Sequence, residues 1–209
     1  MEELDYGPNG GLMYCMEFLA SNLDWFRDKL GDYEEDYLII DCPGQIELYT
    51  HSGVMKRIVD FLHREMGYKM VTLYLLDSNF VGDSSKFVAG TLMCLASMVH
   101  FEMPHLNILT KVDLLGKAAY TSDFDKFLEV NVPVLLAEDR TTTKSERFLA
   151  LSEAIGELLD QWNLVNFIPL DISNEECISD LLAHIDNATQ YGENEEPKEP
   201  EDEFDEEGL

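Results

Sequence analysis

The run "MVTLYLLD", from Met70 to Asp77, is a short apolar segment that ends in a carboxylate. Such a run, bounded by polar residues, is typical of a strand buried on both faces of a sheet. Three further runs have the same form: "YLIID" from Tyr37 to Asp41, "HLNILTK" from His105 to Lys111 and "NFIPLDI" from Asn166 to Ile172. The sequence therefore predicts four buried strands.

Helical patterns lie between these runs. Val54 to Glu65 is amphipathic, and Ser84 to Phe101 is rich in Ala, Leu, Met and Val, which predicts a more buried helix. Two later helices are predicted by capping-box patterns, Thr143-x-x-Glu146 and Ser173-x-x-Glu176. Strands that alternate with helices of this length predict βαβ units. The predicted fold class is α/β, a mostly parallel sheet with helices on both faces.

Length and composition exclude several classes of protein. A chain of 209 residues with 45% hydrophobic content can bury one sizeable core. No run approaches the roughly 20 apolar residues of a membrane span, and the acidic start "MEELDYG" does not have the pattern of a signal peptide. The four cysteines are far apart, which argues against a disulfide framework or a zinc site and fits a reducing compartment.

The charge of the chain is strongly negative and unevenly distributed. A net charge of −28 argues against direct binding of nucleic acid through a basic surface. Residues 193–207 hold ten acids and one lysine, so we expect a disordered tail at 192–209 after a domain at 1–191. The tail has two open interpretations, a solubilising segment and a docking strip for a basic partner.

The first predicted strand is followed by Asp41-Cys42-Pro43-Gly44-Gln45. Ligands of parallel sheets bind beyond the carboxyl ends of the strands. A carboxylate there can hold a hydrated Mg²⁺ that bridges phosphate oxygens, and a glycine three residues later lets its backbone N–H approach a terminal phosphate. A neighbouring glutamine can orient an attacking water. Taken alone, the segment also fits an ordinary turn after a strand.

The third predicted strand ends in Thr110-Lys111-Val112-Asp113. A carboxylate two residues after a lysine suits guanine, because it can accept from the ring N1–H and from the exocyclic amine while the lysine stem lies over the base. Adenine has an acceptor at N1 and would be rejected. Lysine and aspartate are common on loops, but two such motifs, each closing an apolar strand, together favour a nucleotide site over ordinary turns.

These motifs resemble the GPN-loop GTPases, a branch of the P-loop NTPases with a Ras-like α/β fold. The resemblance covers essentially the whole chain and is closest to the third eukaryotic paralogue. It rests on "GPN" at Gly7, Pro8 and Asn9, "DCPGQIELYTH" from Asp41 to His51, "TKVDLL" from Thr110 to Leu115, and the "QYGE" and acidic run near the end.

The resemblance implies a role for each matching residue. Asp41 would serve the Mg²⁺ shell, and Gly44 with Gln45 would serve the γ-phosphate and the attacking water. Thr110, Lys111 and Asp113 would bind the guanine of GTP or GDP. Gly7, Pro8 and Asn9 would form a loop that reaches the active site of the dimer partner. The Asn9 amide would stabilise the phosphate group in transfer there.

Two features depart from the family pattern. The last guanine loop matches Leu170-Asp171-Ile172-Ser173, where Ser173 is equally explained as a helix cap. The phosphate-binding loop G-x-x-x-x-G-K-[ST] has no match, since Gly116-Lys117 is followed by alanine and no glycine stands five positions before Gly116. In the family this loop and its strand precede the GPN segment.

The absent loop has an expected structural consequence. In Ras-like sheets its strand lies between the strands that here end at Asp41 and Asp77. Two strand edges would then lack partners, at about 1–3 kcal/mol for each unpaired buried group, against a total stability of about 5–15 kcal/mol. We therefore expect a truncated gene model or alternative-start product, without autonomous folding and inactive alone.

The resemblance also implies a cellular role. The chain would act as a homodimer or with a paralogous GPN-loop GTPase, in the assembly and nuclear import of RNA polymerase II subunits. It would be cytoplasmic and shuttle to the nucleus, without contact to nucleic acid or membrane. The alternative is a nucleotide-incompetent product that acts only as an interaction partner of a paralogous GTPase.

Overall fold

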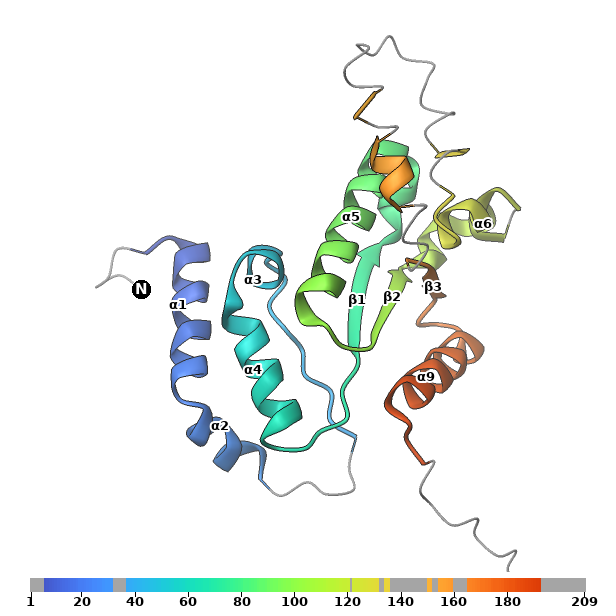
Figure 1. Ribbon diagram of the computed structural model, residues 1–209. Coiled ribbons are helices and arrows are strands. Elements are labelled where there is room, and N and C mark those ends of the chain that lie inside the picture. The colour runs from blue at the N-terminus through green and yellow to red at the C-terminus, as the bar shows by residue number, and fades with distance from the viewer. Residues whose placement is uncertain are drawn as a thin grey trace, which may run out of the picture.

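The computed structural model describes residues 6–31, 37–120, 122–131, 134–135, 150–151, 154–159 and 165–192. The elements begin with α1 (Pro8–Ser21), α2 (Leu23–Leu30), α3 (Glu47–Thr50), α4 (Gly53–Arg64), β1 (Thr72–Asp77), the 3₁₀ helix η2 (Ser78–Gly82) and α5 (Ser84–Phe101). They continue with β2 (His105–Thr110), the 3₁₀ helix η3 (Val112–Tyr120), α6 (Ser122–Leu128), β3 (Phe167–Leu170) and α9 (Glu175–Thr189), as Figure 1 shows. Strands and helices alternate in the second half, and the α/β prediction is confirmed.

The described strands form a parallel sheet in the order β1-β2-β3. Thr72 is opposite His105 and Asp77 is opposite Thr110, so β1 and β2 end level with each other. Three of the four predicted strands are confirmed, each within a few residues of its predicted bounds. The level ends matter for the site, because they place Asp77 beside the residues that follow β2.

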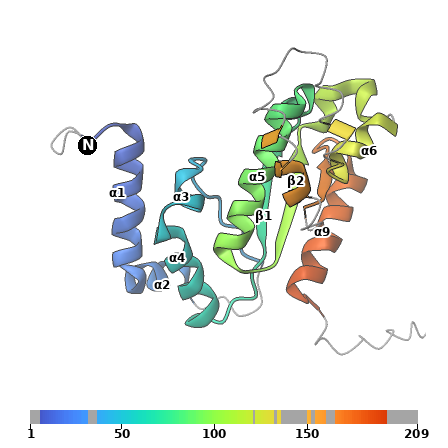
Figure 2. The ribbon, with the colours of Figure 1, turned by 45° about the horizontal axis from the view of Figure 1, so that its top comes forward.

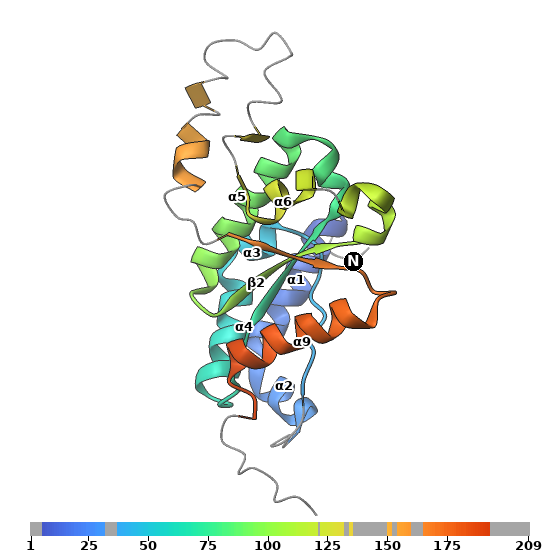
Figure 3. The same cartoon turned by 90° about the vertical axis from the view of Figure 1, so that its right-hand side faces the viewer.

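Helices cover both faces of the sheet. On one face α5 and α6 pack against it, with Phe87 of α5 contacting the rings of Phe127 and Phe167 at centroid distances of 5.1 and 5.5 Å. On the other face, α9 buries Leu181 and Ile185 against Ile108 of β2. Figure 3 is viewed from the α9 side, with α9 in front of the strands and α1 and α4 behind them.

The first four helices pack together beyond the β1 edge of the sheet, next to α5 (Figures 1 and 3). In α4 the buried positions recur every three or four residues; they are Val54, Met55, Ile58, Phe61 and Leu62. They pack with Ala20 of α1, Leu48 of α3 and Phe101 at the end of α5. Figures 1 and 2 both show α1 on the left, α4 next to it, then α5 with the sheet, and α9 on the right.

The strand predicted at Tyr37 to Asp41 is wrong. These residues pair with no strand in the described part of the chain, and Ile39 is 84% exposed. One end is anchored, because the Tyr37 hydroxyl donates to Asp186 Oδ1 at 2.8 Å and its ring packs edge-on against Tyr191. The apolar composition suits a strand, but a strand also needs a backbone ladder partner. Among the described residues β1 pairs only with β2, and its other edge faces no strand.

The capping prediction for α9 is displaced by one residue. Asn174 is the cap, since its side chain accepts from the Glu176 N–H at 3.0 Å. Ser173 instead donates to the Asp171 carboxylate through both its N–H and its hydroxyl. The apolar face of α9 is only partly buried, because Leu181 and Ile185 are buried whereas Leu182 is 45% exposed. Thr143-x-x-Glu146 and the predicted acidic tail lie outside the described residues, apart from Gly192.

The membrane prediction concerns helix length and hydropathy. No helix among the described residues is both long and apolar enough to cross a bilayer.

Candidate functional site

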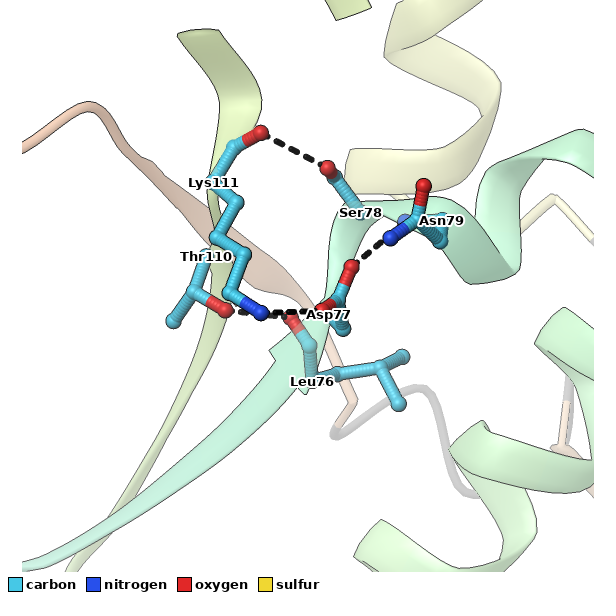
Figure 4. A network of polar contacts seen from close by, with 6 residues as sticks. All are labelled: Leu76, Asp77, Ser78, Asn79, Thr110 and Lys111. Atoms are coloured by element: carbon cyan, nitrogen blue, oxygen red, sulfur yellow. Dashed lines mark hydrogen bonds and ion pairs between the residues drawn. The ribbon is translucent and has the colours of Figure 1, made fainter. Parts of the chain in front are cut away.

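The predicted guanine motif begins where β2 ends. The Thr110 hydroxyl donates to the Leu76 carbonyl of β1 at 3.2 Å (Figure 4). Because this hydroxyl is already bonded to the neighbouring strand, Thr110 links the ends of the two strands. Its observed contact is therefore structural, although sequence reasoning assigned it to the base.

Lys111 has an unusual backbone conformation. Its φ is +60°, in the left-handed region that costs a non-glycine residue about 1 kcal/mol. Its carbonyl accepts two hydrogen bonds, from the Ser78 hydroxyl at 2.8 Å and from the Leu114 N–H at 3.0 Å. Ser78 is completely buried, so its hydroxyl holds the Lys111 backbone from inside the fold.

The Lys111 side chain turns back toward β1. Its Nζ donates to Asp77 Oδ2 at 2.7 Å, while the other oxygen of Asp77 accepts from the Asn79 N–H at 2.9 Å (Figure 4). The side chains of Lys111 and Asp77 are 58% and 29% exposed, respectively. The ion pair is thus formed at the surface, where a ligand can reach it.

The two charges stabilise each other. The hydrogen bond from Lys111, followed by the one from the Asn79 N–H, lowers the pKa of Asp77 below its ordinary value. The same hydrogen bond and the negative charge of Asp77 raise the pKa of Lys111, and Asp113 adds a smaller electrostatic contribution. Both groups are therefore charged at neutral pH.

Asp113 lies in the first turn of η3 and is exposed, whereas Val112 beside it is buried. Val112 anchors the start of η3 in the core on the α5 side of the sheet. An exposed carboxylate that follows a surface lysine at the carboxyl edge of a parallel sheet can accept hydrogen bonds from a planar base. The structure thus brings Lys111 and Asp113 to one edge, as the sequence predicted.

The residues predicted for magnesium and phosphate lie on the Tyr37–Gln45 segment, which ends just before α3. Asp41 and Gly44 are exposed and Gln45 is half-buried. The segment is held near α3 by the Tyr49 hydroxyl, which donates to the Pro43 carbonyl, and by the Leu48 N–H, which donates to the Gln45 carbonyl at 3.2 Å.

The fit of Mg²⁺ to Asp41 depends on its donor chemistry. The described residues contain no group of three or more acidic, histidine or cysteine side chains that could hold a metal ion. Mg²⁺ does not require such a group, since it commonly binds through one or two carboxylates together with waters and substrate phosphates. The exposed carboxylate of Asp41 fits that requirement.

The GPN segment is a helix start rather than the loop that the family resemblance implies. Gly7 is the N-cap of α1, its carbonyl accepts from the Gly11 N–H at 2.9 Å, and Pro8 is the first helical residue. Proline suits this position because its missing N–H would have no partner there. Asn9 is exposed. Since α3 and α4 lie between α1 and the sheet, Asn9 and Lys111 belong to different parts of the chain (Figure 2).

Sequence reasoning assigned no role to Asp77 and Ser78. They become part of the site because β1 and β2 end at the same level, with Asp77 opposite Thr110. A signal was present in the sequence, since "LLD" and "LTK" are both apolar strand ends that finish in charged residues of opposite sign.

Comparison with known proteins shows the family. A family model described as "Conserved hypothetical ATP binding protein" matches residues 1–191. The chain is 52% identical over 200 residues to a "GPN-loop GTPase 3" of Dictyostelium discoideum, covering 96% of this chain and 70% of that protein. It is 46% identical over 203 residues to the protein of that name from Schizosaccharomyces pombe, covering 96% of this chain and 73% of that protein.

A third similar protein, again a "GPN-loop GTPase 3", comes from Mycosarcoma maydis; it is 44% identical over 210 residues, covering 97% of this chain and 74% of the relative. The parallel α/β sheet described above is consistent with a P-loop NTPase fold. Identity at this level over nearly the whole chain implies a shared fold and family. The chain belongs to the GPN-loop GTPase family.

Proposed function

We propose that this chain is the third paralogue of the family and binds and hydrolyses GTP as a dimer. The observation that carries the proposal is the placement of Lys111 and Asp113 just beyond β2, with Lys111 held in a defined conformation. The description of the family model mentions ATP. A carboxylate at Asp113 favours guanine over adenine, because only guanine presents two donors to it.

The phosphate side of the site rests on the residues of the Tyr37–Gln45 segment. Asp41 would hold Mg²⁺, which when bound neutralises negative charge on the phosphate oxygens. The Gly44 N–H would donate to the terminal phosphate, and the Gln45 amide would orient the attacking water. Both residues are accessible in the structure, as these roles require.

The GPN segment would act on the partner's nucleotide. Asn9 is exposed at the start of α1, which lies at the end of the molecule away from the sheet, so a contact across a dimer is compatible with its position. An amide there can donate to the charge that develops during phosphoryl transfer. We propose a homodimer or a pair with a paralogous GPN-loop GTPase. The protein would assist assembly and nuclear import of RNA polymerase II subunits. It would shuttle between the cytoplasm and the nucleus.

A second candidate is an interaction partner that binds no nucleotide itself. It is favoured by one observation, the absence of a match to G-x-x-x-x-G-K-[ST] in the 209 residues. That loop normally supplies backbone N–H groups and a lysine to the phosphates.

Nucleotide binding by the purified chain separates the two candidates. We expect GTP to bind more tightly than ATP. Binding is measured in the presence of Mg²⁺ by the fluorescence of a labelled nucleotide analogue. Asp113→Asn should weaken GTP binding by at least about 100-fold, because the guanine donors lose their acceptor. The same variant should gain xanthosine triphosphate, whose ring carbonyl can accept from the new amide. No binding of either nucleotide would reject the enzyme in favour of the interaction partner. Equal affinity for GTP and ATP would reject the guanine recognition assigned to Asp113 and, with it, the proposed GTPase.

The dimer and its cellular role require separate tests. Sedimentation of the chain alone and mixed with a paralogous GPN-loop GTPase measures homodimer and heterodimer formation. Depletion of the protein in cells should leave RNA polymerase II subunits in the cytoplasm. A monomer under all conditions, or normal nuclear polymerase after depletion, would contradict these proposals.

A further inference from the structure

We infer that Asp77 and Ser78, at the end of β1, are positioning residues that hold Lys111 in place for the guanine base. The inference rests on the proposed function and deepens it, because it assigns part of base recognition to a strand that carries none of the predicted binding residues. The two residues act on different parts of Lys111, one on its backbone and one on its side chain (Figure 4).

The backbone contact explains the unusual conformation of Lys111. A lysine at φ +60° persists only where the surroundings favour it. The buried Ser78 hydroxyl supplies this by donating to the Lys111 carbonyl at 2.8 Å. Because the Lys111 carbonyl is turned inward to Ser78, the chain changes direction after β2. Asp113 follows on the exposed side.

The side-chain contact limits the freedom of a long, flexible residue. Without a partner, the four-carbon stem of a surface lysine samples many rotamers, at a cost of about 2 kcal/mol when it is ordered by a ligand. The Asp77 carboxylate fixes the ammonium group at 2.7 Å, so the stem is already ordered before a base arrives. The carboxylate is itself oriented, because its second oxygen accepts from the Asn79 N–H.

A purely stabilising role does not account for the pair. Exposed ion pairs contribute little to folding stability, and Lys111 is 58% exposed in its side chain. Asp83 provides a comparison, since it also caps a helix, at the start of α5, and pairs with a nearby lysine, Lys86, at 3.6 Å. That pair is local to one helix, whereas Asp77 and Lys111 join two strands at the candidate site.

The test compares Asp77→Asn with the matched control Asp83→Asn. Asparagine can still accept from the N–H that either aspartate caps, so each variant removes mainly the charge. Two quantities are measured on the full chain: the dissociation constant for GTP, and the rate at which an amine-acylating reagent modifies Lys111, followed by mass spectrometry.

We expect Asp77→Asn to weaken GTP binding about twofold to fivefold and to speed acylation of Lys111. Asp83→Asn should change neither quantity. Asp77→Glu should recover part of the affinity, and Asp77→Asn should have no further effect in a Lys111→Met background, because the lysine that it positions is absent. Ser78→Ala should weaken GTP binding without speeding acylation as much, since the Asp77 contact remains.

The outcomes separate this inference from the proposed function. If the unaltered chain prefers GTP to ATP but Asp77→Asn changes neither affinity nor acylation, the positioning role is rejected and the proposed function stands. The positioning role is also rejected if Asp77→Asn weakens GTP binding as much in the Lys111→Met background as in the unaltered chain, because the effect of Asp77 then does not depend on Lys111. A chain that shows no preference for GTP rejects the proposed function, and the positioning role with it.

Discussion

The two segments that carry the predicted site chemistry differ in how the structure holds them. The residues after β2 are tied to β1 by the hydrogen bonds of Thr110, Lys111 and Ser78. The Tyr37–Gln45 segment has a similarly apolar run before its polar motif, yet it joins no strand among the described residues and leaves Ile39 exposed.

The comparison shows that a strand-end motif is oriented by its neighbour. Thr110 and Lys111 are placed by Leu76, Asp77 and Ser78 of the adjacent strand end, all distant in sequence. Asp41 has no such neighbour among the described residues, and its segment is anchored near its two ends, through Tyr37 at one and through Pro43 and Gln45 at the other. Four predictions test this difference.

The largest expected effect compares two isoleucines of the two regions. Ile108→Ala should destabilise the protein by about 2–5 kcal/mol, because Ile108 is completely buried between β2 and α9. Ile39→Ala should change stability by no more than about 0.5 kcal/mol, because Ile39 is 84% exposed. Urea unfolding measures both. Similar losses in the two variants would mean that the Tyr37–Gln45 segment is also packed in solution.

A second prediction uses two glycines. A Cβ at Gly90 of α5 would lie 2.9 Å from Leu76 Cδ1, so Gly90→Val should cost about 1–3 kcal/mol by overpacking and displace the end of β1. At Gly44 a Cβ would have no neighbour within 4 Å among the described residues, and Gly44→Val should alter stability by less than about 0.5 kcal/mol. Thermal unfolding distinguishes them, and an equal cost at both positions would contradict the difference in packing.

The third prediction concerns the first residue of β2. Neither ring nitrogen of His105 has a hydrogen-bond partner in the described part of the chain, and burial lowers its pKa to about 4. The His105 ring therefore becomes protonated at a higher pH in the unfolded chain than in the folded one. The contribution of the neutral ring to folding stability is complete above about pH 6.5 and declines as the pH falls toward 4.

Because the ring remains partly exposed, the loss of folding stability between pH 7 and pH 4.5 should be only about 1–2 kcal/mol. Chemical denaturation of the unaltered chain and of His105→Leu at these two pH values measures it. If both proteins lose the same stability, the ring is not buried as described.

The smallest expected effect is that of Asp77→Asn on stability. The pair with Lys111 is exposed, so the thermal midpoint at neutral pH should fall by no more than about 2 °C. Because the folded pKa of Asp77 is lowered, its contribution is present above the ordinary aspartate pKa and is lost as pH falls through the lowered value. Scanning calorimetry at pH 7 and pH 3 checks this, and a midpoint loss that is large at neutral pH would show a structural rather than a positioning role.

Much of the fold could be predicted from local pattern. The apolar composition of four segments was enough to predict that they are buried. Three of them form β1, β2 and β3, and the fourth, Ser84–Phe101, forms α5. The failures occurred where structure depends on a partner. Tyr37–Asp41 has the composition of a strand but lacks a ladder, and Ser173 has the chemistry of a cap but bonds to Asp171 while Asn174 caps α9.

The sequence by itself determined the α/β class, the family, and the presence of Lys111 and Asp113 after an apolar strand, because these follow from hydrophobic spacing and motif chemistry along the chain. Only the tertiary structure decided that Asp77 and Ser78 hold Lys111 and that Gly7-Pro8-Asn9 begins a helix that lies away from the sheet. The physical reason is that strand register brings together residues more than thirty positions apart, and the energy of those contacts exists only once the sheet has formed.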